Sequence, residues 1–168
     1  MLHGDMTDKE IHSLFEHPQI SAFLTLTHGE GFGLPVFEAA YTGMPVIAPG
    51  WSGHLDFLVN KETGSDEFYN VEYDLQPIPE NVVWEGVIIK ECMWAYPRQH
   101  SAKQQMRRCF SDLTSEENDS HHQRATAHAG YLRETFAEEK QFALMVNEVC
   151  EALQMSVGVV EDEILEFG

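Results

Sequence analysis

The chain has 168 residues, of which 43% are hydrophobic, and this is enough material for one domain with a hydrophobic core. Its 28 acidic and 10 basic residues give a net charge of −18, which argues against nucleic acid and anionic membrane surfaces as partners. The three cysteines are widely spaced, and the sequence shows neither a signal-peptide pattern nor an apolar run of membrane-spanning length. These features predict a cytoplasmic protein without membrane insertion.

The first elements predicted along the chain alternate between helix and strand. Thr7 and Glu10 have the spacing of a capping box, which predicts a helix that starts there. The apolar run 20–27 predicts a buried parallel strand, the segment 35–41 a helix, and 45–48 a second short buried strand. Strands separated by helices imply a parallel sheet that is covered on both faces, which is an α/β fold.

The remaining elements are predicted with a change of character near the middle of the chain. Gly43 is expected to end the helix over 35–41, and alternating residues over 71–75 predict a half-exposed strand. The second half of the chain is predicted to be mostly helical, with a polar linker over 114–122. We therefore expect a single domain over 1–155, followed by an acidic tail over 156–168 that either docks on another domain or is frayed.

The segment 28–38, His-Gly-Glu-Gly-Phe-Gly-Leu-Pro-Val-Phe-Glu, is the most informative part of the sequence. It joins a predicted strand to a predicted helix through a glycine loop, and this layout can turn a helix N-terminus into an anion site. Two carboxylates bracket the loop, Glu30 inside it and Glu38 in what we expect to be the first turn of the helix. A loop that can hold both a phosphate and sugar hydroxyls predicts a nucleotide-sugar site.

This segment also resembles a known family. Glu-Gly-Phe-Gly-Leu-Pro, followed by Thr-Gly-Met-Pro-Val-Ile-Ala over 42–48, is similar to the donor-binding core of retaining glycosyltransferases with the GT-B architecture. The family motif is a glutamate, seven residues and a second glutamate, which Glu30 and Glu38 match. The resemblance covers most of 4–150 and is strongest over 28–57. It implies a Rossmann-like, three-layer parallel sheet, here incomplete, with a helical C-terminal half.

The resemblance also implies a reaction, the transfer of a glycosyl group from a nucleotide-diphosphate sugar with retention of configuration. Glu30 would be the catalytic residue and would hold the donor-sugar hydroxyls, and Glu38 would accept hydrogen bonds from the ribose. Backbone amides of Gly33 and Leu34 would meet the diphosphate. No metal ion and no further cofactor is expected. The donor-binding set implied in this way is His28, Gly31, Phe32, Gly33, Leu34 and Glu38.

Parts that such an enzyme needs are not found in this sequence. A complete enzyme of this type has two Rossmann-like domains and about twice this length. Lys9 is the only lysine or arginine before Lys61, so no cationic clamp for the diphosphate can be assigned near the motif. We therefore expect a C-terminal donor-binding portion that acts with an acceptor domain in cis or in trans. The strand over 20–27 or that over 45–48 would then lack a neighbour, which predicts a homodimer.

Three interpretations remain open at this point. The chain is either a catalytic half, a nucleotide-sugar-binding module without activity of its own, or a Rossmann-like interaction protein whose motif is a structural glycine turn. His28 is equally compatible with contact to a sugar or phosphate and with packing over the loop. Donor binding separates the first two interpretations from the third, and product formation with a supplied acceptor domain separates the first from the second.

Overall fold

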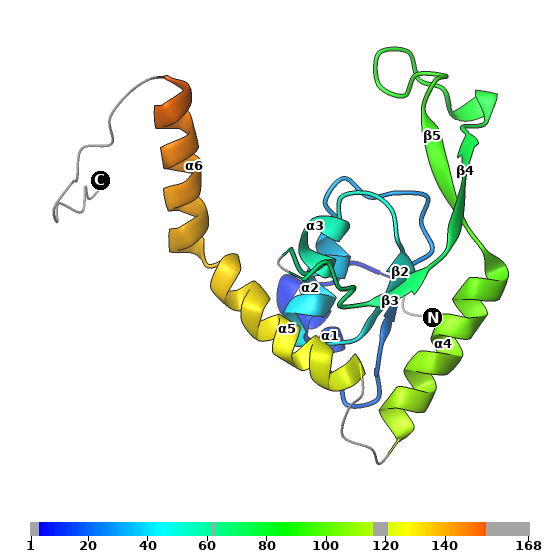
Figure 1. The fold of residues 1–168 in the computed structure, drawn as a ribbon, viewed down its shortest axis with the longest axis vertical. Coiled ribbons are helices and arrows are strands. Elements are labelled where there is room, and N and C mark those ends of the chain that lie inside the picture. The colour runs from blue at the N-terminus through cyan, green and yellow to red at the C-terminus, as the bar shows by residue number, and fades with distance from the viewer. Residues whose placement is uncertain (1–3, 62, 116–120, 154–168) are drawn as a thin grey trace, which may run out of the picture. The chain divides into compact units, whose positions relative to one another are not determined.

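A computed structural model describes residues 4–61, 63–115 and 121–153 of the chain (Figure 1). The chain divides into two compact units, Met1–Leu132 and Arg133–Gly168. The first unit is a mixed α/β structure with a three-stranded parallel sheet, which agrees with the predicted α/β class. The acidic tail expected over 156–168, with its boundary after residue 155, lies outside the described residues.

The described elements of both units follow one another in the order α1 (Asp8–Phe15), β1 (Phe23–Leu24), α2 (Leu34–Thr42), β2 (Val46–Pro49), α3 (Leu55–Leu58), β3 (Tyr69–Val71), β4 (Tyr73–Pro77), a 3-10 turn (Glu80–Val82), β5 (Met93–Pro97), α4 (Gln99–Thr114), α5 (His121–Thr135) and α6 (Glu138–Ala152).

The parallel sheet has the strand order β1-β2-β3. Its central strand β2 is buried at all four positions, so the buried strand predicted over 45–48 is confirmed with a shift of one residue. The prediction of a parallel strand within 20–27 is confirmed, but its expected length and burial are wrong. β1 has only two residues, and Leu24 is 43% exposed. The physical reason is its place at the edge of the sheet, where among the described strands only β2 pairs with it.

The helices near the motif begin and end where local signals place them. Thr7 and Glu10 form the predicted capping box at the start of α1, and their hydrogen bonds lower the pKa of the Glu10 carboxyl. α2 begins at Leu34 and is closed by Gly43, whose left-handed conformation (φ 85°) suits a residue without a β-carbon.

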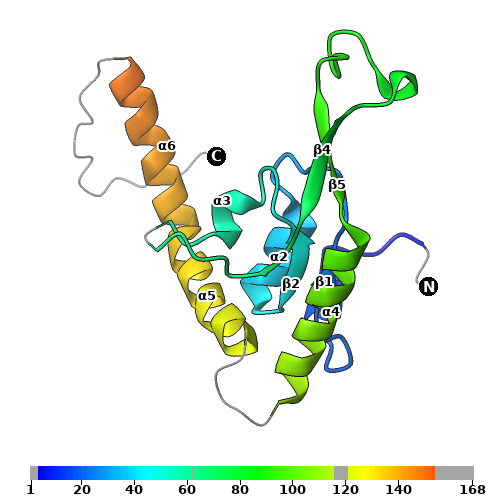
Figure 2. The ribbon, with the colours of Figure 1, turned by 45° about the vertical axis from the view of Figure 1, so that its right-hand side comes forward.

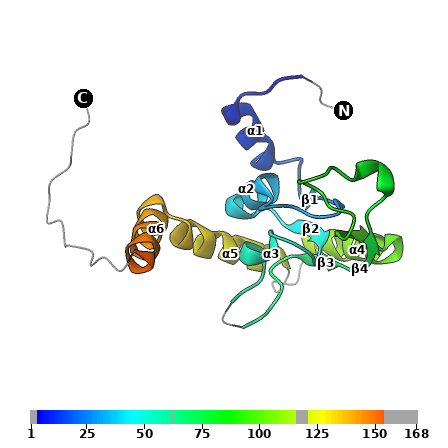
Figure 3. The same ribbon diagram turned by 90° about the horizontal axis from the view of Figure 1, so that it is seen from above.

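Helices pack on both sides of the sheet. α2 lies on one side of β2 and α4 on the other (Figure 3). Under α4, the sheet residues Ile47 and Tyr69 form a buried cluster with Cys109. The Tyr69 hydroxyl donates to Asp112 of α4 at 3.0 Å. The first part of α5 is held through His128, whose Nε2 donates to the Phe57 carbonyl at 2.6 Å.

A two-stranded antiparallel ribbon, β4 and β5, extends from the sheet (Figure 2). The predicted half-exposed strand over 71–75 is therefore two strands in two sheets, because the chain leaves the parallel sheet at Glu72. We call residues 73–97 the arm. It carries large hydrophobic side chains that are each at least 40% exposed, namely Leu75, Val83, Trp84, Val87, Ile89 and Met93.

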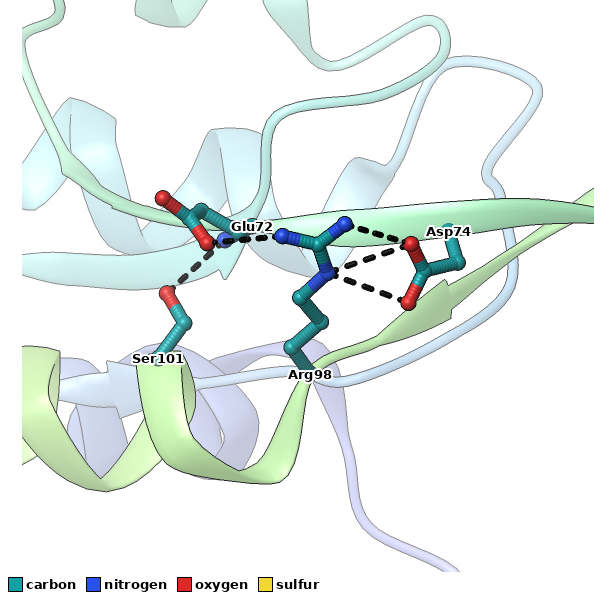
Figure 4. Close-up of polar contacts among 4 residues, drawn as sticks. All are labelled: Glu72, Asp74, Arg98 and Ser101. Atoms are coloured by element: carbon teal, nitrogen blue, oxygen red, sulfur yellow. Dashed lines mark hydrogen bonds and ion pairs between the residues drawn. The ribbon is translucent and has the colours of Figure 1, made fainter.

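Arg98 joins the base of the arm to α4 (Figure 4). Its guanidinium donates to Asp74 at 2.6–3.1 Å and to Glu72 at 3.2 Å, and its backbone N–H donates to the Glu72 carbonyl at 2.7 Å. Ser101 accepts from the Glu72 N–H at 2.9 Å. The hydrogen bonds from Arg98 lower the pKa of Asp74. Because these groups are exposed, the cluster orients the arm relative to α4 more than it stabilises the fold.

In the second unit, the ammonium group of Lys140 donates to Glu134 at 2.9 Å, which lowers the pKa of that carboxyl. The side chain of Gln141 donates to the Thr135 carbonyl at 2.9 Å, so both contacts link the start of α6 to the end of α5. None of the helices within the described ranges is long and apolar enough to cross a membrane.

Candidate functional site

The loop 28–33 leaves β1 at its carboxyl end and leads into α2. In parallel sheets this end of the strands is where ligands bind. His28, the first loop residue, is fixed to β5 by a pair of hydrogen bonds. Its Nδ1 donates to the Ala95 carbonyl at 2.8 Å, and the Ala95 N–H donates back to the His28 carbonyl at 3.1 Å. The position of the loop therefore depends on the base of the arm.

Glu30 is the most firmly held residue of the loop. Its Oε1 accepts from the Thr27 hydroxyl at 2.8 Å, and its N–H donates to the Ser52 hydroxyl at 2.8 Å. Its carbonyl accepts from the Gly53 N–H at 3.1 Å. Within the described part of the chain no hydrogen bond reaches Oε2, so a fixed carboxylate keeps one oxygen for a ligand.

The segment 50–54 after β2 forms the second side of the loop. The backbone of Ser52 adopts a left-handed conformation (φ 82°), which residues other than glycine rarely adopt. In this conformation the Ser52 hydroxyl accepts the hydrogen bond from the Glu30 N–H. His54 is buried and its Nε2 donates to the Pro49 carbonyl at 2.7 Å. Its Nδ1 is buried without a hydrogen-bond partner in the structure. Because His54 begins α3, this bond ties that helix to the end of β2.

The start of α2 supplies backbone donors. Gly33 precedes the helix in a left-handed conformation (φ 86°), and the first bond across this turn runs from the Phe37 N–H to the Gly33 carbonyl at 2.9 Å. The Leu34 N–H precedes that bond and so does not donate within the helix. The Leu34 side chain is 64% exposed, whereas the Phe32 ring packs against Phe37 and Phe57 with centroids 5.4 and 5.0 Å apart. Phe32 therefore anchors the loop in addition to any contact with a ligand.

Glu38 lies within α2, whereas Glu30 lies in the loop before that helix. The first turn of α2 contains no acidic residue, so the expected place of Glu38 in that turn is wrong, because the helix begins at Leu34 and Glu38 falls in its second turn. Glu38 is exposed and lines a pocket of about 270 Å³ with Asp8 and His12 of α1, a pocket that Glu30 does not line. The structure thus places Glu38 beside α1 and Glu30 beside the turn after β2.

Several residues that hold the site were not predicted as site residues. Thr27, Ser52 and Gly53 fix Glu30, and Lys103 of α4 lines the same pocket as His28. The glycine turn around Ser52 and Gly53 was visible in the sequence, but its hydrogen bonds to Glu30 were not. No local pattern marks Lys103, because 75 residues separate it from His28 and the fold of the intervening strands decides where it lies.

In the described ranges, no group of three or more His, Cys, Asp or Glu side chains is arranged to hold a metal ion. Comparisons with protein-family models, with curated proteins and with solved structures found no match to this chain.

Proposed function

We propose that this chain binds a nucleotide-diphosphate sugar as the donor-binding part of a retaining glycosyltransferase. Donor binding is assigned to a Rossmann-like domain formed around the parallel sheet, and acceptor binding to a second domain in cis or in trans. The proposal rests on the sequence motif over 28–48 together with one structural observation. That observation is the Glu30 carboxylate, held by Thr27 with a free oxygen beside the N-terminus of α2.

The geometry of the loop supports a division of roles. Glu30 would accept hydrogen bonds from donor-sugar hydroxyls through its free oxygen, without first having to be ordered. The Leu34 N–H and the positive end of α2 would meet the diphosphate, where negative charge increases as the sugar leaves. Glu38 would reach the ribose only if the nucleotide passes over the first turn of α2 toward α1. The role of Glu38 is therefore the more demanding part of the proposal.

The proposal is tested by measuring donor binding to the purified chain. The measurement is an NMR titration with a panel of nucleotide-diphosphate sugars. We expect weak binding, in about the millimolar range. Glu30→Gln should weaken it severely, since a hydrogen bond between a ligand hydroxyl and a charged group contributes about 1.5–3 kcal/mol. Glu85→Gln, which makes the same change at an exposed position of the arm, is the control and should bind like the wild type.

Unchanged affinity in both Glu30→Gln and Glu38→Gln, with a normal circular dichroism spectrum, would contradict the assignment. If the donor binds as expected, a supplied acceptor domain separates the two remaining possibilities. Product formation identifies a catalytic half, and its absence with bound donor identifies a binding module.

A protein-interaction module is the second candidate function, and the arm favours it. Exposed Trp84, Val87 and Ile89 give a two-stranded ribbon an apolar surface that a ribbon cannot bury by itself. In this case none of the nucleotide sugars would bind, and substitutions in the loop 28–33 would alter stability alone.

A further inference from the structure

A pocket of about 450 Å³ lies next to the motif loop, which contributes only His28 to it, and the roles proposed above do not use it. Its walls come from three parts of the chain that the fold brings together, the end of β1, the end of β5 and the first turns of α4. The residues that matter for its chemistry are Leu26, His28, Tyr96, Gln99, Lys103 and Met106.

The charge of this pocket is opposite to that of the chain. The chain carries a net charge of −18, yet none of the described residues that line the pocket is a carboxylate, whereas Lys103 is one of them. Lys103 makes no ion pair with the described residues. Arg98, the other cation at the start of α4, is bound to Asp74 and Glu72 and is therefore not available to a ligand. The pocket thus holds one uncompensated positive charge.

His28 contributes a second polar group with a fixed orientation. Its ring lies parallel to Trp94, with centroids 5.1 Å apart, and 4.4 Å from the ring centroid of Tyr96. Because Nδ1 donates to the Ala95 carbonyl, Nε2 is the atom left for other partners, and no described residue bonds to it. Nε2 accepts a hydrogen bond when the ring is neutral and donates one to an anion when it is charged.

The remaining walls suit the carbon skeleton of a ligand. Leu26 and Met106 are apolar, and the Tyr96 ring offers a face on which a planar group can stack. A cation, an imidazole and the Gln99 amide above an apolar floor are the groups that bind a phosphate ester with a ring attached. A pocket for a cation would instead be expected to contain carboxylates, and its described lining residues include none.

We propose that this pocket binds the phosphate-bearing part of the donor, with Lys103 as the principal contact of the phosphate and His28 and Gln99 beside it. This inference rests on the proposed function, because it takes the ligand of the pocket and the ligand of Glu30 to be one molecule. It gives the motif the cation that the sequence near it lacks. This path replaces the one toward Glu38: the diphosphate runs from the N-terminus of α2 to Lys103, and the ring attached to it lies against Tyr96.

The test compares Lys103→Gln with Lys61→Gln, which removes the same charge from an exposed position outside the pocket. Uridine, guanosine and adenosine diphosphates, the corresponding nucleosides and inorganic pyrophosphate are titrated by NMR. We expect Lys103→Gln to weaken diphosphate binding by about fivefold, the upper range for a solvent-exposed ion pair, and Lys61→Gln to leave it unchanged. Added salt should weaken the wild type more than Lys103→Gln.

The outcomes separate this proposal from the proposed function. If nucleotide sugars bind in a Glu30-dependent way but Lys103→Gln binds them like Lys61→Gln, the pocket is not the phosphate site and the proposed function stands. If pyrophosphate binds through Lys103 while no nucleotide sugar binds, the pocket is a phosphate site and the proposed function fails. If neither a diphosphate nor pyrophosphate binds the wild-type chain, the pocket proposal is overturned.

Discussion

Gly53 lies against Gly31 so closely that a β-carbon at position 53 would overlap the carbonyl oxygen of Gly31. In addition, the Gly53 N–H donates to the carbonyl of the neighbouring Glu30 at 3.1 Å. At Gly53 the loop after β1 and the turn after β2 therefore meet backbone to backbone. Any side chain at position 53 has to push the motif loop away from the turn that fixes it.

We predict that Gly53→Ala destabilises the chain by about 1–3 kcal/mol, the usual cost of forcing extra atoms into a packed site. It should also abolish donor binding, because Glu30 would lose its position. Urea unfolding and NMR titration measure the two effects. Gly31→Ala is the matched control for stability, since a β-carbon there meets open space and Gly31 has no positive φ. Equal stability of the two variants would contradict the packing argument.

Ser52 combines a favourable hydrogen bond with an unfavourable backbone conformation. Its hydroxyl accepts from the Glu30 N–H, while its φ of 82° lies in the region that favours glycine. Ser52→Ala should therefore lose about 1 kcal/mol of stability with the hydrogen bond. Ser52→Gly loses the same bond but relieves the backbone, which contributes about 1–2 kcal/mol, and should be the more stable variant. Thermal unfolding of the two variants compares their stabilities. If Ser52→Ala is the more stable, the backbone at this position is not strained.

Much of the motif region could be predicted because its signals are local. The capping box of Thr7 and Glu10 and the start of α2 beside Pro35 depend on residues within one turn of each other. The left-handed Gly43 is also a local feature. The central strand β2 was predictable for a different reason, since burial on both faces leaves a continuous apolar run.

The parts that could not be predicted depend on contacts between distant segments. The run 20–27 is mostly apolar, but its place at the sheet edge limits the strand to Phe23–Leu24. The division of the strand at Glu72 follows from its hydrogen bond with Ser101 and from the pairing of β4 with β5. Lys103 reaches the His28 pocket only because the arm returns the chain to the end of β1 before α4 begins.

Alkaline pH should weaken the core under α4. Burial, together with the hydrogen bond to Asp112, raises the pKa of the Tyr69 hydroxyl well above its usual value, and burial also raises the pKa of the Cys109 thiol. The unfolded chain loses the tyrosine proton near pH 10, while the folded chain keeps it. Above that pH the unfolded state binds fewer protons, so stability falls as pH rises, by up to about 1.4 kcal/mol per pH unit for one proton.

The contribution of Tyr69 is measured by urea unfolding at several pH values between 9 and 11, a range set by the usual tyrosine pKa of about 10. Tyr69→Phe should be less stable at neutral pH but should show a shallower decline above pH 10 than the wild type. Tyr131→Phe changes a ring that is 42% exposed and should decline like the wild type. The same slope in Tyr69→Phe and the wild type would remove Tyr69 from the explanation.

The open edge of β1 predicts self-association. The N–H groups of Phe23 and Thr25 donate to carbonyls of or next to β2, at 2.9 and 3.0 Å, so the backbone of Leu24 between them faces away from the sheet. No described strand pairs with that side, and Leu24 and Leu26 are each more than 40% exposed. We expect two copies to pair their β1 edges around a two-fold axis. Light scattering should then report close to twice the chain mass of 19.1 kDa.

Leu24→Pro is the sharpest test, because it removes the outward N–H and leaves the hydrogen bonds of Phe23 and Thr25 to the neighbouring strand in place. It should be monomeric and folded, whereas Leu24→Thr keeps the N–H and should remain a dimer. Since each copy carries a charge of −18, added salt should strengthen the wild-type dimer by screening repulsion. A wild-type monomer at micromolar concentration in high salt, or a dimer that Leu24→Pro leaves intact, would exclude pairing through this edge.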